Sequence, residues 1–180
     1  MKKCILFIAT LLILSSCKKD TTIAIGQHLQ GGIIFYIDST GNHGLIASLN
    51  DQSDGIPWSN GNDTIRTNAS GYAIGTGQSN TKIIVNMLGQ GRYAAIICED
   101  LVLDGYNDWY LPSSAELNLL YLHKDTIGGF AQAYYWSSTD MGGSPHAFYA
   151  VNQDLATGSG KMNNLMMKAS SNHVRAIRSF

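Results

Sequence analysis

Charge is scarce in this sequence, and neither sign predominates. Only 14% of the 180 residues are charged, and the formal net charge is −1. A chain with this balance offers no positive field for a nucleic-acid backbone, so nucleic acid is not an expected partner. The hydrophobic fraction of 44% is large enough to form a buried core, which excludes global disorder. The length favours one compact domain.

Cysteine is also scarce, and its three positions lie far apart, at Cys4, Cys17 and Cys98. This spacing excludes a disulfide framework and a zinc cluster. Cys98 is the only cysteine well inside the predicted domain. We therefore expect it to be an inert, buried hydrophobic residue.

The sequence has no hydrophobic run long enough to cross a bilayer, because its longest apolar stretch, at 5–14, is only about half of the ~20 residues that a spanning helix needs. This stretch follows Lys2 and Lys3 and ends in small residues, which is typical of a secretory signal. The four residues at the end of this signal, LSSC at 14–17, resemble the bacterial lipobox. The cysteine of a lipobox is diacylated and becomes the first residue of the mature protein.

We therefore predict a lipoprotein signal peptide at 1–16, a palmitate-type lipid on Cys17, and a tether that extends to residue 25. The alternative is an ordinary signal in which the cysteine is incidental. The lipoprotein hypothesis predicts attachment to a membrane of the bacterial cell envelope, in the outer membrane, through lipid chains rather than a spanning helix. Loss of Lys2 and Lys3 leaves the mature chain mildly acidic.

Residues 26–180 are predicted to form a single α+β domain with mixed, mainly antiparallel sheets, two to three short helices and long loops. β-Branched and aromatic runs predict strands at 33–37, 45–49, 134–139, 146–151 and 173–180. Apolar periodicity predicts helices at 81–88 and 93–101. The Gly/Asn-rich stretch at 50–77 is predicted to be a long loop, and a turn is expected at 158–160.

A capping box gives the sharpest local signal. Ser113 follows Pro112 and precedes Glu116 by three positions, so the serine is expected to cap a helix while the glutamate reaches back to it. The helix is expected to end near Lys124. This assigns Pro112, Ser113 and Glu116 structural roles.

Five short motifs recur here in the order found in a known family. They are GGIIFY at 31–36, GNHGLIA at 41–47, DWYLPS at 108–113 with EL at 116–117, YWSST at 135–139, and VRAIR at 174–178. By these motifs the chain resembles the Lcl C-terminal domain family of bacterial lipoproteins and surface proteins, whose function is largely unknown. The resemblance implies a C-type-lectin-like fold over residues 26–180.

The resemblance carries limited functional information. The adhesin for which the family is named binds sulfated glycans, but a mildly acidic domain is less suited to polyanions. The motif around Trp109 is also similar to one in formylglycine-generating enzymes. Those enzymes use a cysteine pair for copper, and this domain has only Cys98 besides the lipidated Cys17.

Aromatic residues are the main candidates for ligand binding. Trp109 and Trp136 either anchor the core, which is the favoured interpretation, or stack on a sugar face. Tyr110 and Tyr149 are expected to be exposed and able to contact a ligand, next to recognition loops at 50–77 and 140–146.

Calcium is the only ion for which the sequence offers a ligand set, at Asp104, Asn107 and Asp108. A polar turn is the alternative and the favoured interpretation, and no cofactor is otherwise expected. Arg175 and Arg178 lie an odd number of positions apart on the predicted last strand, so they should point to opposite faces and serve structural roles.

These features favour a non-enzymatic binding module for a glycan or an envelope protein. Two alternatives remain: an enzyme of the formylglycine-generating type, and a purely structural envelope subunit. An enzyme would need a convergent set of perturbed titratable groups, and the sequence shows none.

Overall fold

The computed structural model describes residues 23–143, 146–156 and 164–180. The predicted signal peptide, Cys17, most of the tether and the expected turn at 158–160 lie outside these residues. No helix in the described ranges is long and apolar enough to cross a membrane.

In the described residues, two sheets and four short helices form the predicted α+β fold, with one or two helices more than expected. The first sheet has the order β1 (His28–Leu29), β2 (Gly32–Ile37), β3 (Gly44–Ser48) and β9 (Ile177–Ser179). The second has the order β4 (Ser53–Ile56), β8 (Asn172–Val174), β5 (Tyr134–Asp140), β6 (Tyr149–Asp154) and β7 (Asn164–Met167). All strand pairs are antiparallel except β5 with β8.

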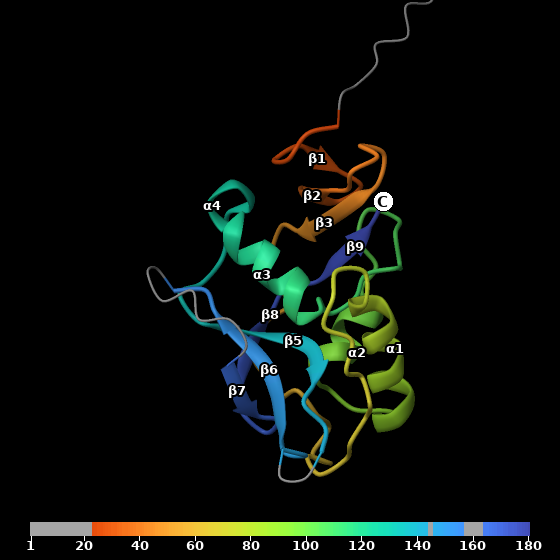
Figure 1. Ribbon diagram of the computed structural model, residues 1–180, viewed down its shortest axis with the longest axis vertical. Coiled ribbons are helices and arrows are strands. Elements are labelled where there is room, and N and C mark those ends of the chain that lie inside the picture. Colours follow the sequence, from red (N-terminus) through yellow and green to blue (C-terminus); the bar gives the residue numbers. More distant parts are fainter. Residues whose placement is uncertain (1–22, 144–145, 157–163) are drawn as a thin grey trace, which may run out of the picture.

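The first sheet lies at the top of the molecule in Figure 1 and the second at the bottom, and the helices flank the middle and lower parts. On one side are α3 (Ser114–Leu122) and α4 (Lys124–Ile127), and on the other are α1 (Gly77–Leu88) and α2 (Ala94–Glu99). The last strand, β9, pairs with β3, so both ends of the described chain lie in the top sheet.

Most of the predicted elements are confirmed, and the described residues also contain β1, β7 and α4, which were not predicted. Three predicted segments differ from the structure. The expected loop at 50–77 contains strand β4, and the strand expected at 146–151 begins three residues later, at Tyr149. The final stretch divides into β8 and β9, which belong to different sheets. One strand cannot belong to both sheets. The extended segment is therefore interrupted at Arg175 and Ala176, between β8 and β9.

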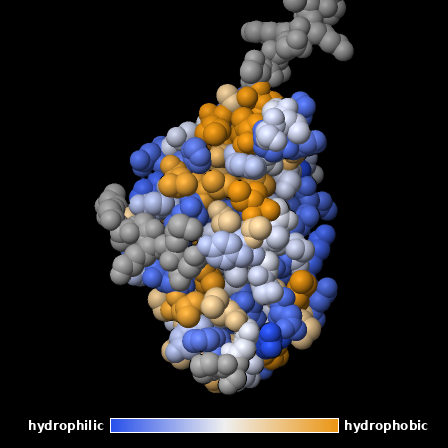
Figure 2. Space-filling view, in the orientation of Figure 1, coloured by the Kyte–Doolittle hydropathy of each residue, from blue (hydrophilic) through white to orange (hydrophobic). Residues whose placement is uncertain are grey.

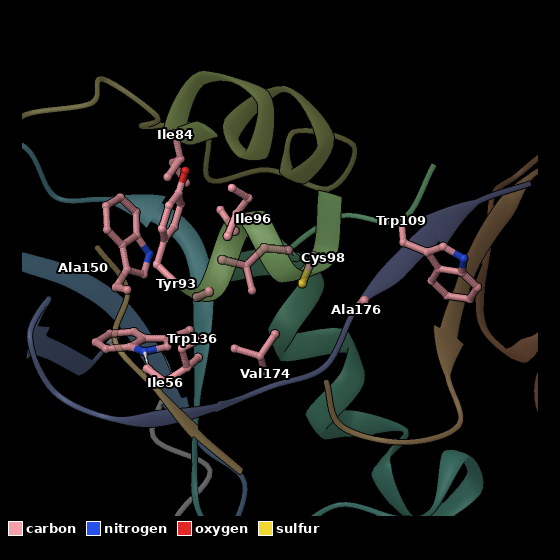
Figure 3. Packing of buried hydrophobic residues seen from close by; sticks show 14 of the residues in the cluster. Ile56, Ile84, Tyr93, Ile96, Cys98, Trp109, Trp136, Ala150, Val174 and Ala176 are labelled. Atoms are coloured by element: carbon pink, nitrogen blue, oxygen red, sulfur yellow. Dashed lines mark hydrogen bonds between the residues drawn. The ribbon is translucent and has the colours of Figure 1, made fainter. Parts of the chain in front are cut away.

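The core of the lower half is built around two tryptophans. Trp58 and Trp136 are completely buried, and each indole N–H donates to a backbone carbonyl, of Ser137 at 2.8 Å and of Ile56 at 2.9 Å respectively. Figure 3 shows Trp136 beside Ile56, whereas Trp109 lies on the far side of Ala176, away from this group. Trp58 therefore fixes the expected loop region to β5.

A buried ion pair also holds this region. The Lys168 ammonium lies 2.9 Å from the Asp140 carboxylate, and neither side chain is exposed to solvent. Lys168 also donates to the carbonyl of Ile65 at 2.8 Å and lies 4.8 Å from the centre of the Trp58 ring. Asp140 accepts from the backbone N–H and the hydroxyl of Thr67, at 2.8 and 2.6 Å. The pair thus connects the 57–70 segment to the lower sheet.

Candidate functional site

Two tight turns that touch each other line an open pocket of about 450 Å³. The β1–β2 turn forms one side, and the hairpin at 103–106 forms the other. Three leucines and three polar side chains share the lining, namely Leu29, Leu49 and Leu103 together with His28, Gln30 and Asp104. A concave, partly apolar site with a few polar groups is the usual form of a ligand pocket.

Both turns have positive φ at each central residue, as a type I′ turn requires. In the β1–β2 turn these residues are Gln30 (φ 49°) and Gly31 (φ 84°). In the facing turn they are Asp104 (φ 54°) and Gly105 (φ 78°), and the flanking residues Leu103 and Tyr106 exchange two hydrogen bonds of 3.0 Å. The Asp-Gly pair is a sequence signal for such a turn that our sequence analysis missed.

The turns approach each other so closely that only glycine fits at position 31. A Cβ atom at Gly31 would come within 2.8 Å of the Cβ atom of Asp104. The left-handed backbone at this position also disfavours any other residue. Gly31 therefore determines how near the two walls of the pocket can come.

Arg178 connects the two walls through its side-chain contacts. Its Nε and one terminal nitrogen donate to the two carboxylate oxygens of Asp108 at 2.7 and 2.8 Å, and its other terminal nitrogen donates to the Gln30 side chain. The guanidinium also lies over the Tyr106 ring, 4.0 Å from its centre. The hydrogen bonds from Arg178 hold the pKa of Asp108 below its ordinary value. Arg178 thus acts as a positioning residue for the pocket.

The three predicted calcium ligands lie in this hairpin and the residues that follow it, but their oxygens have different surroundings. Asp104 and Asn107 are exposed, whereas both oxygens of Asp108 already accept from Arg178. A cation at Asp108 would lie beside the Arg178 guanidinium, whose positive charge would repel it. Within the described ranges no cluster of three His, Cys, Asp or Glu side chains has the spacing to hold a metal.

The expectation that Tyr110 is exposed is wrong. Its side chain is only 1% exposed, and its hydroxyl lies 3.2 Å from the Ser179 hydroxyl and 3.5 Å from Glu116. Burial raises the pKa of Tyr110. Trp109 and Trp136 are buried to the same extent. None of these three rings can stack on a ligand, because each is covered by the core.

Tyr149 is the one aromatic candidate with accessible surface. It lies on β6 and is half-buried, with the ring of His146 beside it at a centroid distance of 6.2 Å. It does not line the pocket between the two turns. The sequence-predicted aromatic residues therefore do not converge on one binding surface.

Ser113 and Glu116 form the predicted capping box of α3. Glu116 accepts from the backbone N–H of Ser113 and of Gly75, both at 2.7 Å, so it also fastens the preceding loop to the helix. Pro112 contributes its carbonyl to Ser138 at 2.7 Å. Burial is the largest influence on Glu116 and raises its pKa. Both of its oxygens serve the fold.

Arg175 organises a second polar cluster that our sequence analysis did not foresee. Its Nε donates to Asp51 at 2.6 Å, and the other Asp51 oxygen contacts the Tyr135 hydroxyl at 2.6 Å and His173 Nδ1 at 3.0 Å. The remaining guanidinium groups donate to backbone carbonyls, the shortest bond being to Gly129 at 2.6 Å. Asp51 and Arg175 lie far apart in sequence, so no local pattern could reveal the pair.

The Arg175 cluster stabilises the loop that borders a second, smaller pocket of about 310 Å³, lined chiefly by residues 128–132. Phe130 from this loop lies under the Arg175 guanidinium at 4.2 Å. The two arginines therefore bind different carboxylates and brace different loops.

Cys98 is a buried thiol on α2, and Figure 3 shows it beside the core residues Ile96 and Ala176. Burial raises its pKa, so the thiol stays protonated. A protonated, inaccessible thiol is a poor nucleophile and a poor metal ligand.

Among models of known protein families, the one described as the Lcl C-terminal domain matches residues 47–178. This range includes the 103–106 turn and Arg178, but not the β1–β2 turn that forms the opposite wall of the pocket. The comparison with curated proteins gives no match.

Proposed function

The chain belongs to the Lcl C-terminal domain family, and from this premise we propose that it is a non-enzymatic binding module of the bacterial cell envelope, anchored in the outer membrane through a lipid on Cys17. Its ligand binds in the pocket between the β1–β2 turn and the 103–106 turn. The observation that carries this assignment is the construction of the pocket: two tight turns, joined by Arg178, line an open cavity with mixed apolar and polar walls.

The character of the walls favours a protein ligand over a glycan. Leu29, Leu49 and Leu103 provide apolar surface, and among the described residues no aromatic ring lines the pocket to stack on a sugar. Asp104 offers an exposed carboxylate at the rim. An apolar side chain followed by a hydrogen-bond donor or a cation suits this arrangement.

Commitment of the ionisable groups to the fold supports a role in binding rather than catalysis. Asp51 and Asp108 are paired with arginines, Glu116 caps a helix, and Cys98 is buried. A catalytic site needs such groups to converge on an accessible cleft.

The proposal can be tested with one pocket variant and one matched control. Leu49→Glu places a charge on the pocket wall, whereas Val102→Glu places it on a more exposed residue beside the pocket that does not line it. We expect capture of the same partner from envelope extracts by the wild type and by Val102→Glu, and loss of capture with Leu49→Glu. A glycan array run in parallel tests the other ligand class.

Two results would contradict the proposed function. One is an empty array together with an empty pull-down for the wild type. The other is a Leu49→Glu variant that captures its partner as well as the control does. The lipid anchor is tested separately, with a Cys17→Ser variant. If this variant still incorporates labelled palmitate, the proposal that Cys17 carries the lipid is refuted.

A further inference from the structure

An exposed apolar surface surrounds the point at which the described chain begins. The side chain of Leu122, at the end of α3, is 63% exposed, and that of Ile25 is 44% exposed. Figure 2 shows hydrophobic side chains gathered in the upper half of the visible face, around the N-terminal segment and the region of α3 and α4. We call this the anchor-side surface and define it by Ile25, Leu119, Tyr121 and Leu122.

The two most exposed members lie on neighbouring elements. A Cβ atom at Gly26 would lie 3.0 Å from Cγ2 of Thr126, so the N-terminal segment runs against α4. Leu122 is the last residue of α3, and α4 begins two residues later, at Lys124. Leu119 and Tyr121 are partly buried and pack against the core of the upper half. The core therefore supports the surface from beneath.

Charge does not dominate this surface. Its lysine, Lys124, donates to the carbonyl of Leu155 at 2.9 Å and lies 4.8 Å from the centre of the Tyr121 ring. The next residue, Asp125, is exposed and carries the opposite charge. The surface is therefore suited to an apolar partner rather than to a strongly anionic one.

We propose that the anchor-side surface lies against the lipid bilayer and orients the domain on the membrane. This inference rests on the lipid anchor of the proposed function. At full extension the chain from Cys17 to Ile23 reaches only about 20 Å, so the anchor holds this end of the domain close to the lipid. So short a tether keeps the exposed apolar surface near the bilayer. Contact with lipid then removes the apolar side chains from water, which is favourable. The acyl chains supply the attachment and the surface supplies the orientation.

The test places an environment-sensitive dye on this surface and on a matched residue elsewhere. Leu122→Cys carries the dye in one variant. Met87→Cys carries it in the other, because Met87 lies on α1 with 50% exposure and is distant from the N-terminal segment. The native Cys98 is buried and does not compete for the label. Both lipidated, full-length variants are reconstituted into vesicles of phosphatidylethanolamine and phosphatidylcholine.

We expect dye at position 122 to shift its emission to shorter wavelength in vesicles and to lose its quenching by aqueous iodide, while dye at position 87 keeps its aqueous spectrum. Adding Ile25→Ser to the Leu122→Cys variant should reduce the shift. Protein that floats with the vesicles while both dyes remain aqueous would overturn the orientation and leave the anchor intact. A shift at both positions would also overturn it. Failure of the protein to float would refute the anchor itself, and the orientation with it.

Discussion

Removal of Lys168 should be the most destabilising change to a single charge in the lower half of the molecule. The ammonium and its partner Asp140 are both fully buried, so Lys168→Met leaves a carboxylate in the interior without its counter-charge. Asp140 would keep its hydrogen bonds from Thr67, but these come from neutral donors. Methionine matches the length of the lysine stem, so the change tests the charge rather than the volume.

The expected loss follows from the contacts that disappear. Breaking one side of a buried ion pair costs about 3–5 kcal/mol, because the remaining charge is not solvated. The interaction of the ammonium with the Trp58 ring contributes within that range, since such contacts are worth about 1–2 kcal/mol when desolvated. For a chain of this size the loss corresponds to a fall in Tm of roughly 6–20 °C.

Urea unfolding monitored by circular dichroism measures the effect as a change in the free energy of unfolding at an unchanged m value. Lys82→Met is the matched control, because Lys82 is exposed on α1 and should change stability by no more than about 0.5 kcal/mol. A double variant, Lys168→Met with Asp140→Asn, should be less destabilised than the sum of the two single variants, because the charge left unpaired by one change is removed by the other.

A Lys168→Met variant that unfolds within about 1 kcal/mol of the wild type would refute this reasoning. That result would mean that the pair is hydrated or that its desolvation already offsets the attraction. Additive losses in the double variant would likewise show that the two groups do not interact.

Two further predictions concern the pocket. Gly31→Ala should destabilise the protein by about 1–3 kcal/mol, because the new Cβ atom would meet Asp104 in a left-handed backbone; Gly41→Ala has a similar φ with open space around it and should cost only about 1 kcal/mol in the same melting experiment. Asp108→Asn should lose stability at neutral pH. The pKa of Asp108 is lowered in the folded state, so its stabilising contribution is present above its ordinary value of 3.8 and is lost as the pH falls through the lowered pKa. The wild type and the Asp108→Asn variant should therefore converge in acid, and a difference that persisted there would assign the effect to something other than the charge.

The local features of the fold could be predicted because their determinants lie close together in sequence. The hairpin of β2 and β3 follows from two β-branched runs on either side of a turn, and the α3 cap follows from Ser113 and Glu116, three residues apart. Boundaries were less certain where tertiary contacts decide them. Strand β4 forms in a Gly/Asn-rich stretch because β8 is there to pair with it.

Burial of the aromatic residues was only partly predictable. The core interpretation of Trp109 and Trp136 rested on their size. Tyr110 was expected to be exposed as an aromatic residue available to a ligand. Instead its backbone exchanges hydrogen bonds with Ile177 while its side chain is enclosed near Glu116 and Ser179.

The sequence by itself determined the family motifs, the α+β class, the capping box and the predicted location in the cell envelope. All of these depend on local patterns. Only the tertiary structure decided where a ligand can bind. The pocket exists because two turns about 70 residues apart meet, and because Arg178 reaches Asp108 across a similar separation and Gln30 across about twice that distance in sequence. Pairing between such distant residues depends on the path of the whole chain, and a sequence pattern of a few residues does not record that path.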